Sequence, residues 1–287
     1  MPELPEVELV AKSLDRLVSG QTILFAELIR ERLAPQTPPG EFAARLDNST
    51  VNSVTRRGKY ILFDLSNGQT LLVHLRMSGR FMLLPLERDL PKFSHAVFYL
   101  PEEMRLVFSD QRHFGFMKIV RTPELSRSKE IAKLAPEPFS DDFSPEYFKS
   151  ALKASNRSVK EFLLDQTKVA GLGNIYAAEA LFLARINPQT RSSAISTLKA
   201  RRLRKVLIEV LAESIENGST INVDPENIDG SYYDGGFENH WHVYDREGEP
   251  CAFCESKIKR VIQAGRSSYF CPKCQRSKPK RRMKRMT

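Results

Sequence analysis

The chain has 287 residues, 41% of them hydrophobic and 28% charged, with a formal net charge of +9 at pH 7. This length and composition are ordinary for a globular protein and argue against disordered and fibrous classes. No apolar run approaches the roughly 20 residues of a membrane helix, and the acidic start MPELPEVE differs from a signal peptide, so we expect a cytosolic protein without a membrane partner. The positive charge indicates a polyanionic partner, most simply nucleic acid.

The first part of the chain predicts one helix followed by strands. A helix is expected over residues 5–18, where Pro5 suits the first turn, apolar residues recur at three- and four-residue steps, and Gly20 ends the pattern. Residues 21–120 contain several short strand-like runs, with a hairpin turn at residues 66–68 between YILFDL and TLLVHL. Short strands separated by regular turns favour a β-sandwich.

The sequence changes character after residue 121. Three prolines mark residues 122–142 as a linker. Helical patterns follow: Ser158 and Glu161 fit a capping box, and apolar residues have helical spacing over 175–184 and 196–216. The sequence therefore predicts an α+β protein in which a helical domain follows the strands.

The four cysteines predict a metal site. They are spaced C-x2-C-x16-C-x2-C, as Cys251, Cys254, Cys271 and Cys274. Four thiolates in this pattern suit one tetrahedral Zn²⁺, and because they leave no open coordination position the zinc is expected to be structural. Two disulfides or another soft metal are the alternatives. The residues between the pairs read as a two-stranded hairpin that presents Arg266 at its tip, within reach of a phosphate.

The C-terminal tail has seven basic residues and no acid over residues 276–287, and we expect it to be disordered. Such a tail can add sequence-independent affinity for nucleic acid. The chain is thus predicted to consist of an N-terminal β-sandwich domain (1–121), a linker (122–142), a helical domain ending in a long loop (143–249), a zinc hairpin (250–275) and this tail.

The N-terminus could carry a nucleophile. A small residue such as Pro2 normally allows Met1 to be removed, which leaves a secondary amine next to the carboxylate of Glu3. An α-amine has a pKa near 8, so part of it is unprotonated at neutral pH and can attack a masked carbonyl such as C1′ of a deoxyribose. The alternative is that PELPE is simply the start of a helix.

Several motifs occur together in one order: PELPEVE, RRGKY, HLRMSG, the R-H-F run before Gly115, GLGNIYAAE and GRSSYFCPKCQ. In this the chain resembles the formamidopyrimidine-DNA glycosylase family (Fpg), within the wider Fpg/Nei superfamily, from Pro2 to Gln275. The resemblance implies an N-terminal β-sandwich with flanking helices, a helix–two-turn–helix domain with a β-hairpin zinc finger, and one structural Zn²⁺. It also implies a monomer that works on damaged double-stranded DNA in the bacterial cytosol and nucleoid.

The resemblance implies a bifunctional DNA glycosylase and abasic-site lyase of base-excision repair. It would remove oxidised purines, 8-oxoguanine and formamidopyrimidines, through a Schiff base and cleave the strand by β,δ-elimination. Pro2 would be the nucleophile, Glu3 the general acid and base, and Glu6 a support for both. Lys59 would act near the lesion phosphate or as a proton donor, and Arg266 would bind the flanking phosphates and assist the second elimination.

The resemblance also assigns DNA contacts. His74 and His95 would lie near the DNA, and the backbone would be bound by Lys160, Asn174 and Arg266. An enzyme that flips a nucleotide out of the stack must fill the hole, and the residues implied for this are Met77, Arg112 and Phe114. Without the resemblance, the simpler interpretation is that Met77 and Phe114 belong to the core, that His74 is a core or edge residue, and that Lys59 and Arg112 are surface charges.

Some positions depart from the family pattern. Arg76 stands where glycine is more usual, DQRHFG replaces DPRRFG, and Asn156 stands where lysine is frequent. The loop 218–239, which covers the flipped purine in the family, matches only loosely. Two rival functions therefore stay open: an endonuclease VIII-like activity on oxidised pyrimidines or other adducts, and a lesion-binding protein without chemistry.

Overall fold

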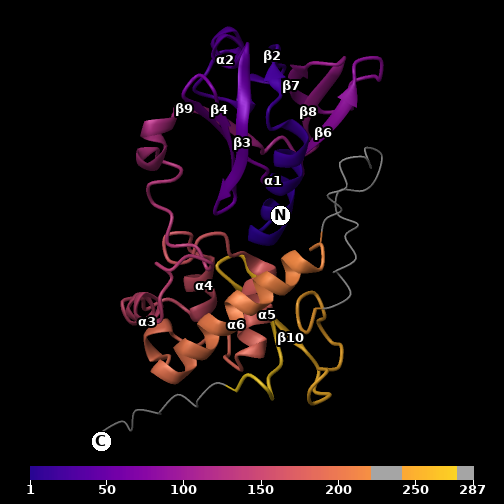
Figure 1. Cartoon of the computed structure of the whole chain (residues 1–287). Coiled ribbons are helices and arrows are strands. Elements are labelled where there is room, and N and C mark those ends of the chain that lie inside the picture. The colour runs from indigo at the N-terminus through magenta and orange to yellow at the C-terminus, as the bar shows by residue number, and fades with distance from the viewer. Residues whose placement is uncertain (221–240, 277–287) are drawn as a thin grey trace, which may run out of the picture. The chain divides into compact units, whose positions relative to one another are not determined.

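The structure is a computed structural model that describes residues 1–220 and 241–276 (Figure 1). Contacts divide it into two compact units. The first comprises Met1–Glu137 with residues 211–220, and the second comprises Pro138–Val210 with residues 241–276. No helix in these described ranges is long and apolar enough to cross a membrane.

The first unit begins with helix α1 (Leu4–Val18), which packs on strand β3 (Ser49–Arg57). Glu3 precedes the helix as its N-cap, and Pro5 lies in the first turn, where a missing N–H costs nothing. The apolar positions spaced for a helical face, from Val7 to Val18, are buried. The helix predicted over residues 5–18 is confirmed.

Two antiparallel sheets form most of the first unit. The five-stranded sheet has the order β1 (Thr22–Ile23), β3, β4 (Tyr60–Leu65), β5 (Gln69–His74) and β9 (Phe116–Arg121). The four-stranded sheet has the order β2 (Phe25–Leu28), β7 (Ser94–Leu100), β8 (Met104–Asp110) and β6 (Gly79–Pro85). The turn predicted at residues 66–68 joins β4 to β5.

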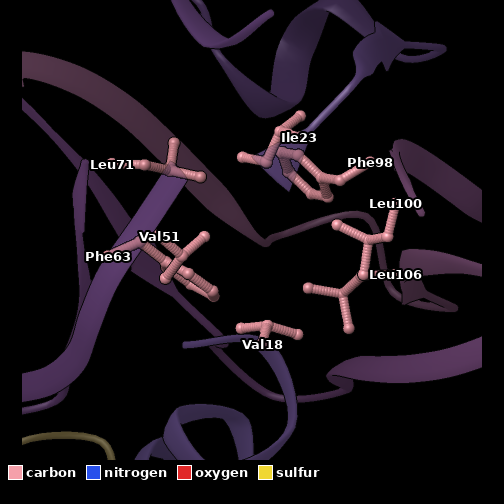
Figure 2. Close-up of a pocket in the computed structure, with 8 residues that line it drawn as sticks. All are labelled: Val18, Ile23, Val51, Phe63, Leu71, Phe98, Leu100 and Leu106. Carbon is pink, nitrogen blue, oxygen red and sulfur yellow. The ribbon is translucent and has the colours of Figure 1, made fainter. Parts of the chain in front are cut away.

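The core of the first unit lies between its two sheets. Figure 2 shows apolar side chains from both sheets facing one small void, among them Phe63 and Leu71 from one sheet and Phe98 and Leu106 from the other. Its volume is about 10 Å³, room for no more than one water, and its lining offers that water no polar partner. The void is therefore a packing gap, and the β-sandwich prediction is confirmed.

One element of the first unit was not expected. Residues 21–120 were predicted as strands and turns, yet α2 (Pro39–Leu46) is a helix that packs on β2. Pro39 lies in its first turn, and Phe42 and Leu46, four residues apart, are buried. The Pro-Pro-Gly start resembles a loop, so a helix of eight residues gives little periodic signal.

The second unit is helical around an aromatic core. Its α-helices are α3 (Pro145–Lys153), α4 (Val159–Leu164), α5 (Asn174–Leu183) and the N-terminal part of α6 (Thr197–Glu216). A short 3₁₀ helix lies at Ser192–Ala194, and the first unit has two more, at Glu31–Leu33 and Thr122–Arg127. Phe148, Phe162 and Tyr176 are fully buried. The capping box of Ser158 and Glu161 is confirmed.

A hairpin of β10 (Lys259–Gln263) and β11 (Arg266–Phe270) completes the second unit and packs on α5. Its turn uses positive φ angles at Ala264 and Gly265, which the glycine accepts without strain. The hairpin is where the sequence predicted it. The predicted loop 218–239, apart from residues 218–220, and the predicted tail, apart from Arg276, lie outside the described residues; the domain boundaries stay a prediction.

Candidate active site and metal centre

The N-terminus forms a buried polar cluster in the first unit, which we call the Glu6 cluster: Glu3, Glu6, Ser219 and Thr220. The backbone N–H of Glu3 donates to Glu6 Oε2 at 2.8 Å, and the two residues form a reciprocal capping box. Glu6 Oε1 accepts hydrogen bonds from the hydroxyl of Ser219 and, at 3.0 Å, from that of Thr220. Pro2 is buried directly beside this cluster.

Lys59 and His74 lie on neighbouring strands at the end of the five-stranded sheet. Lys59 follows Gly58 in the turn from β3 to β4, and Tyr60 pairs with His74 on β5. Both candidate side chains are buried, so Lys59 is not a surface lysine. Burial, together with the positive charges of Arg76 and Lys59, lowers the pKa of His74 to about 3. His74 is therefore a neutral imidazole at physiological pH.

The tautomer of His74 follows from its hydrogen bond. Its Nδ1 accepts the backbone N–H of Arg76 at 3.0 Å, which leaves Nε2 as the nitrogen that carries the proton. Arg76 adopts a φ of +57°, the left-handed region that favours glycine. This explains why a glycine is the more usual residue there, and it shows that the chain accommodates arginine at this turn.

Asp110 joins the two loops that carry the predicted void-filling residues. Its carboxylate accepts hydrogen bonds from the Ser78 hydroxyl and from the backbone N–H groups of Arg112 (3.2 Å) and Gly115 (2.6 Å). Burial acts to raise the pKa of Asp110, but these hydrogen bonds outweigh it and the pKa is lowered. A Cβ at Gly115 would lie 2.8 Å from the Phe108 ring, so the close approach requires glycine.

The side chains on these two loops point into solvent. Met77 is 38% exposed and Phe114 is 56% exposed, so the alternative that they belong to the core is wrong. The Arg112 guanidinium lies 5.5 Å from the centre of the Phe114 ring. Two exposed apolar side chains and a cation on rigidly joined loops can enter a base stack and bond an unpaired base.

His95 forms a pair with His113, the residue that follows Arg112. Nδ1 of His113 lies 3.0 Å from Nε2 of His95, and the rings are stacked with their centres 5.0 Å apart. Burial lowers the pKa of His95, as do its electrostatic interactions with His113 and Arg30, while Asp110 opposes them. The replacement of arginine by histidine in DQRHFG thus brings His113 to His95.

The four cysteines converge on one point in the second unit. Their sulfur atoms all lie within 4.8 Å of one another, and all four are free thiols, which contradicts the disulfide alternative. Zn–S bonds of about 2.3 Å place the sulfurs of a tetrahedral site about 3.8 Å apart. The Cys251–Cys274 and Cys254–Cys271 pairs, at 3.9 and 3.4 Å, fit this geometry. The chain therefore has a site for one structural Zn²⁺.

The other predicted DNA ligands lie on the second unit. Lys160 is buried, and its Nζ donates to Ser267 O at 2.9 Å. Asn174 is the first residue of α5, and its Oδ1 is buried without a hydrogen-bond partner among the described residues. Arg266 begins β11 and, with Arg157, lines an open groove of about 780 Å³. A helix N-terminus and the Arg266 guanidinium suit phosphate groups, whereas Arg157 is paired with Asp165 at 3.2 Å in the same groove.

Comparisons with known proteins decide the family. The domain families described as Formamidopyrimidine-DNA glycosylase N-terminal domain, Formamidopyrimidine-DNA glycosylase H2TH domain and Zinc finger found in FPG and IleRS match residues 1–117, 134–224 and 248–276. The formamidopyrimidine-DNA glycosylases of Roseobacter denitrificans and Lactiplantibacillus plantarum are 42% and 38% identical to this chain, with 96% of this chain and 100% of each relative covered. The chain belongs to the formamidopyrimidine-DNA glycosylase family.

A solved structure agrees with this assignment. Lactococcus lactis Fpg in complex with an abasic site containing DNA is similar to this family member with a TM-score of 0.88 at 32% identity, over 96% of this chain and 100% of that chain. The same L. lactis protein is known in complex with a Fapy-dG containing DNA and with an oxidised pyrimidine containing DNA, with TM-scores of 0.88 and 0.87.

Sequence reasoning missed several residues that organise the sites of this glycosylase family member. Ser219 and Thr220 carry no motif and reach Glu6 only through the fold. Glu179 was also missed, although the sequence held a signal for it: it is the one acid in the apolar helix α5. Its carboxylate accepts the backbone N–H groups of residues 242–244 and contacts His242 Nδ1 at 3.0 Å. His242 therefore pairs with the carboxylate of Glu179.

Two further residues support the sites. Glu137 accepts hydrogen bonds from Arg56, Arg57 and the backbone N–H of Gly58, and so fixes the turn that carries Lys59. In the second unit, Gln166 braces the GLGN turn: its Oε1 accepts the N–H of Gly171 at 2.9 Å and its Nε2 donates to Leu172 O at 2.8 Å. Neither side chain stands out in the sequence.

Proposed function

We propose that this family member excises oxidised purines, 8-oxoguanine and formamidopyrimidines, from double-stranded DNA and then cleaves the strand at the abasic site. Membership of the family makes the chain a DNA glycosylase of base-excision repair with lyase activity. The finer choice of oxidised purines follows from the family name and from the complex of L. lactis Fpg with Fapy-dG containing DNA. The bacterial cytosol and nucleoid are its proposed location, and a monomer its proposed form.

The observation that carries the proposed mechanism is the position of Pro2 beside the Glu6 cluster. The Pro2–Glu3 peptide is fixed, because its N–H donates to the buried carboxylate of Glu6. Once Met1 is removed, the Pro2 secondary amine attacks C1′ of the damaged nucleotide. The bond from C1′ to the base breaks, the base leaves with a proton, and an iminium joins Pro2 to the sugar.

Glu3 is the proposed proton carrier of this step. Its carboxyl can protonate the ring oxygen of the sugar as the ring opens, and then receive the proton that leaves C2′. Loss of that proton expels the phosphate from C3′, which is the β-elimination. A second proton loss expels the phosphate from C5′, and water then hydrolyses the iminium to release Pro2.

Binding and nucleotide flipping are assigned to the remaining predicted residues. Met77, Arg112 and Phe114 would fill the vacated stack, which their exposure supports. His74 and His95 in the first unit would contact the DNA. In the second unit, phosphates would bind at Lys160, Asn174 and Arg266, with Lys59 and Arg266 also proposed to assist the eliminations. The zinc keeps the hairpin that presents Arg266 folded.

A second substrate class has one specific observation in its favour. L. lactis Fpg has been solved with an oxidised pyrimidine containing DNA, so a chain with 33% identity to it is a candidate for the same lesions. The departures at Arg76 and His113 lie beside the predicted DNA contacts. The third reading, a lesion-binding protein without chemistry, predicts affinity for damaged DNA with no strand cleavage.

Borohydride trapping separates these functions. Protein whose mass shows the loss of Met1 is incubated with duplexes carrying one 8-oxoguanine opposite cytosine, one oxidised pyrimidine or one plain abasic site. An adduct on Pro2 with the first duplex supports the proposed function. An adduct only with the second shifts the substrate to pyrimidines, an adduct only with the abasic site retains the lyase alone, and binding without any adduct leaves the lesion-binding protein.

A further inference from the structure

The Glu6 cluster links two parts of the chain that are more than 200 residues apart. Oε2 of Glu6 accepts the N–H of Glu3 at 2.8 Å, and Oε1 accepts the hydroxyls of Ser219 and Thr220, the latter at 3.0 Å. All four residues are buried, with exposures of 2% for Glu3, 1% for Glu6, 0% for Ser219 and 9% for Thr220. The carboxylate therefore has donors on both oxygens and little contact with water.

A buried carboxylate takes its orientation from its hydrogen bonds. Each charge-assisted bond is shorter and stronger than a neutral one, and removal of a donor leaves part of the charge unsatisfied. The hydroxyls on Oε1 thus restrict rotation of the carboxylate, and this fixes where Oε2 receives the Glu3 N–H. That N–H belongs to the peptide bond between Pro2 and Glu3, so its direction fixes the peptide plane to which the pyrrolidine ring is attached.

Ser219 adopts a backbone conformation that suits a specific contact. Its φ is +60°, in the left-handed region, and it follows Gly218 with a φ of +79°. A non-glycine residue at such an angle is uncommon and carries strain unless its side chain or its neighbours compensate. The bond from its hydroxyl to Glu6 supplies that compensation. The turn at 218–219 therefore delivers two successive hydroxyls to one carboxylate oxygen.

From this geometry we propose that Ser219 and Thr220 are positioning residues for the Pro2 nucleophile. They act through Glu6, and without their hydroxyls the Pro2–Glu3 peptide loses its fixed direction. Because a near-attack geometry contributes strongly to the rate of a covalent step, the loss falls on iminium formation and leaves the affinity for abasic-site DNA, which has no base for the loop to cover, unchanged. The proposal deepens the proposed function and rests on it.

The test uses matched variants of the full chain with Met1 removed. Thr220→Val removes the hydroxyl and keeps the shape, whereas Thr220→Ser keeps the hydroxyl; Ser219→Ala combined with Thr220→Val removes both donors. Thr70→Val is the control for stability, because Thr70 is 2% exposed and its hydroxyl bonds that of Thr122 at 3.0 Å, away from Glu6. Single-turnover borohydride trapping on abasic-site DNA and the DNA dissociation constant are both measured.

The expected result is a slower trapping step at unchanged DNA affinity. The double variant should trap roughly 10- to 100-fold more slowly, which corresponds to the loss of hydrogen bonds to a charged group. Thr220→Ser should restore the trapping rate, and Thr70→Val should lower only the Tm.

The outcomes distinguish failure of the positioning role from failure of the proposed function. If the unmodified chain forms no adduct with any duplex, the proposed function itself fails. If that chain forms an adduct, and the double variant matches it in trapping rate, the positioning role alone is refuted. Should the double variant not fold, Thr220→Val against Thr220→Ser decides: equal rates refute the role, and a slow valine variant with a normal serine variant supports it.

Discussion

The two ends of the described chain are fixed by different chemistry. At the N-terminus, the carboxylate of Glu6 bonds one backbone N–H and two hydroxyls, inside a unit with a large apolar core between two sheets. At the C-terminus, the hairpin β10–β11 packs on α5, and the four cysteines around it bring their sulfur atoms close enough together to share one metal ion. Hydrogen bonds to a carboxylate hold the N-terminal end in place, and a metal site holds the C-terminal end.

This difference shows what each end needs. A nucleophile must be aimed within a narrow range of positions, and directional hydrogen bonds inside a packed core can provide that. A hairpin of two five-residue strands cannot bury enough apolar surface to fold independently, so it needs a covalent or metal link. Damage to the first end should therefore change rates, while damage to the second should change folding.

Removal of the metal should give the largest effect. Structural zinc sites supply most of the folding free energy of small fingers, so Cys271→Ser or a strong chelator should unfold the hairpin and remove Arg266 from its place. We expect loss of stoichiometric zinc by elemental analysis and loss of DNA binding, with near-normal amide protection in the strands of the first unit. A variant without zinc that still binds DNA with full affinity would contradict the distinction between the two ends.

Glu3→Gln, at the N-terminus, should give the next largest effect, a loss of catalytic rate. Glutamine keeps a side-chain oxygen that can accept the N–H of the capping box, so the helix cap should survive. It cannot carry a proton, and general acid–base catalysis contributes about 10²- to 10⁴-fold. Base release from 8-oxoguanine DNA should slow by that factor, with Tm and zinc content unchanged. A variant with full activity would remove Glu3 from the mechanism.

The two ends also differ in how much of them the sequence predicts. The zinc site is local: two C-x2-C pairs enclose a short hairpin, and spacing alone gives the ligands and the geometry. The Glu6 cluster is not local, since Ser219 and Thr220 approach Glu6 only after the whole first unit has folded. Residue type carried no signal for them, because serine and threonine beside a glycine are ordinary turn residues.

Elsewhere the same rule separates what was predicted from what was missed. The strands, α1 and the capping box of Ser158 and Glu161 follow from periods and caps within about ten residues, and the structure contains them. The helix α2 was missed because its eight residues start with prolines. Asp110 and Glu137 were missed because their partners lie on other strands or turns, where only the fold shows the contacts.

Asp110→Asn should give a smaller effect, on the loops that carry Met77 and Phe114. The Asp110 carboxylate accepts three hydrogen bonds on its two oxygens. An asparagine side chain has only one acceptor oxygen, so at least one hydrogen bond to the loops is lost. We expect roughly 10- to 100-fold weaker binding to lesion DNA, since a hydrogen bond to a charged group contributes about 1.5–3 kcal/mol. Binding to undamaged duplex, measured at the same salt, should change little. Equal losses on both duplexes would contradict a role specific to flipping.

The smallest expected effect concerns His74 and pH. Its pKa in the folded chain is about 3, below its usual 6.5, so the unfolded chain binds the extra proton and stability falls as the pH drops from about 6.5 towards 3. The slope is at most about 1.4 kcal/mol per pH unit for one proton. His74→Asn keeps an acceptor for the Arg76 N–H and removes the titration. Urea unfolding at pH 7 and pH 5 should therefore show a smaller loss of stability for the variant than for the unmodified chain. Equal losses would mean that His74 is protonated in the folded chain at pH 5, and it would then contact DNA phosphate as a cation whose contribution falls with salt.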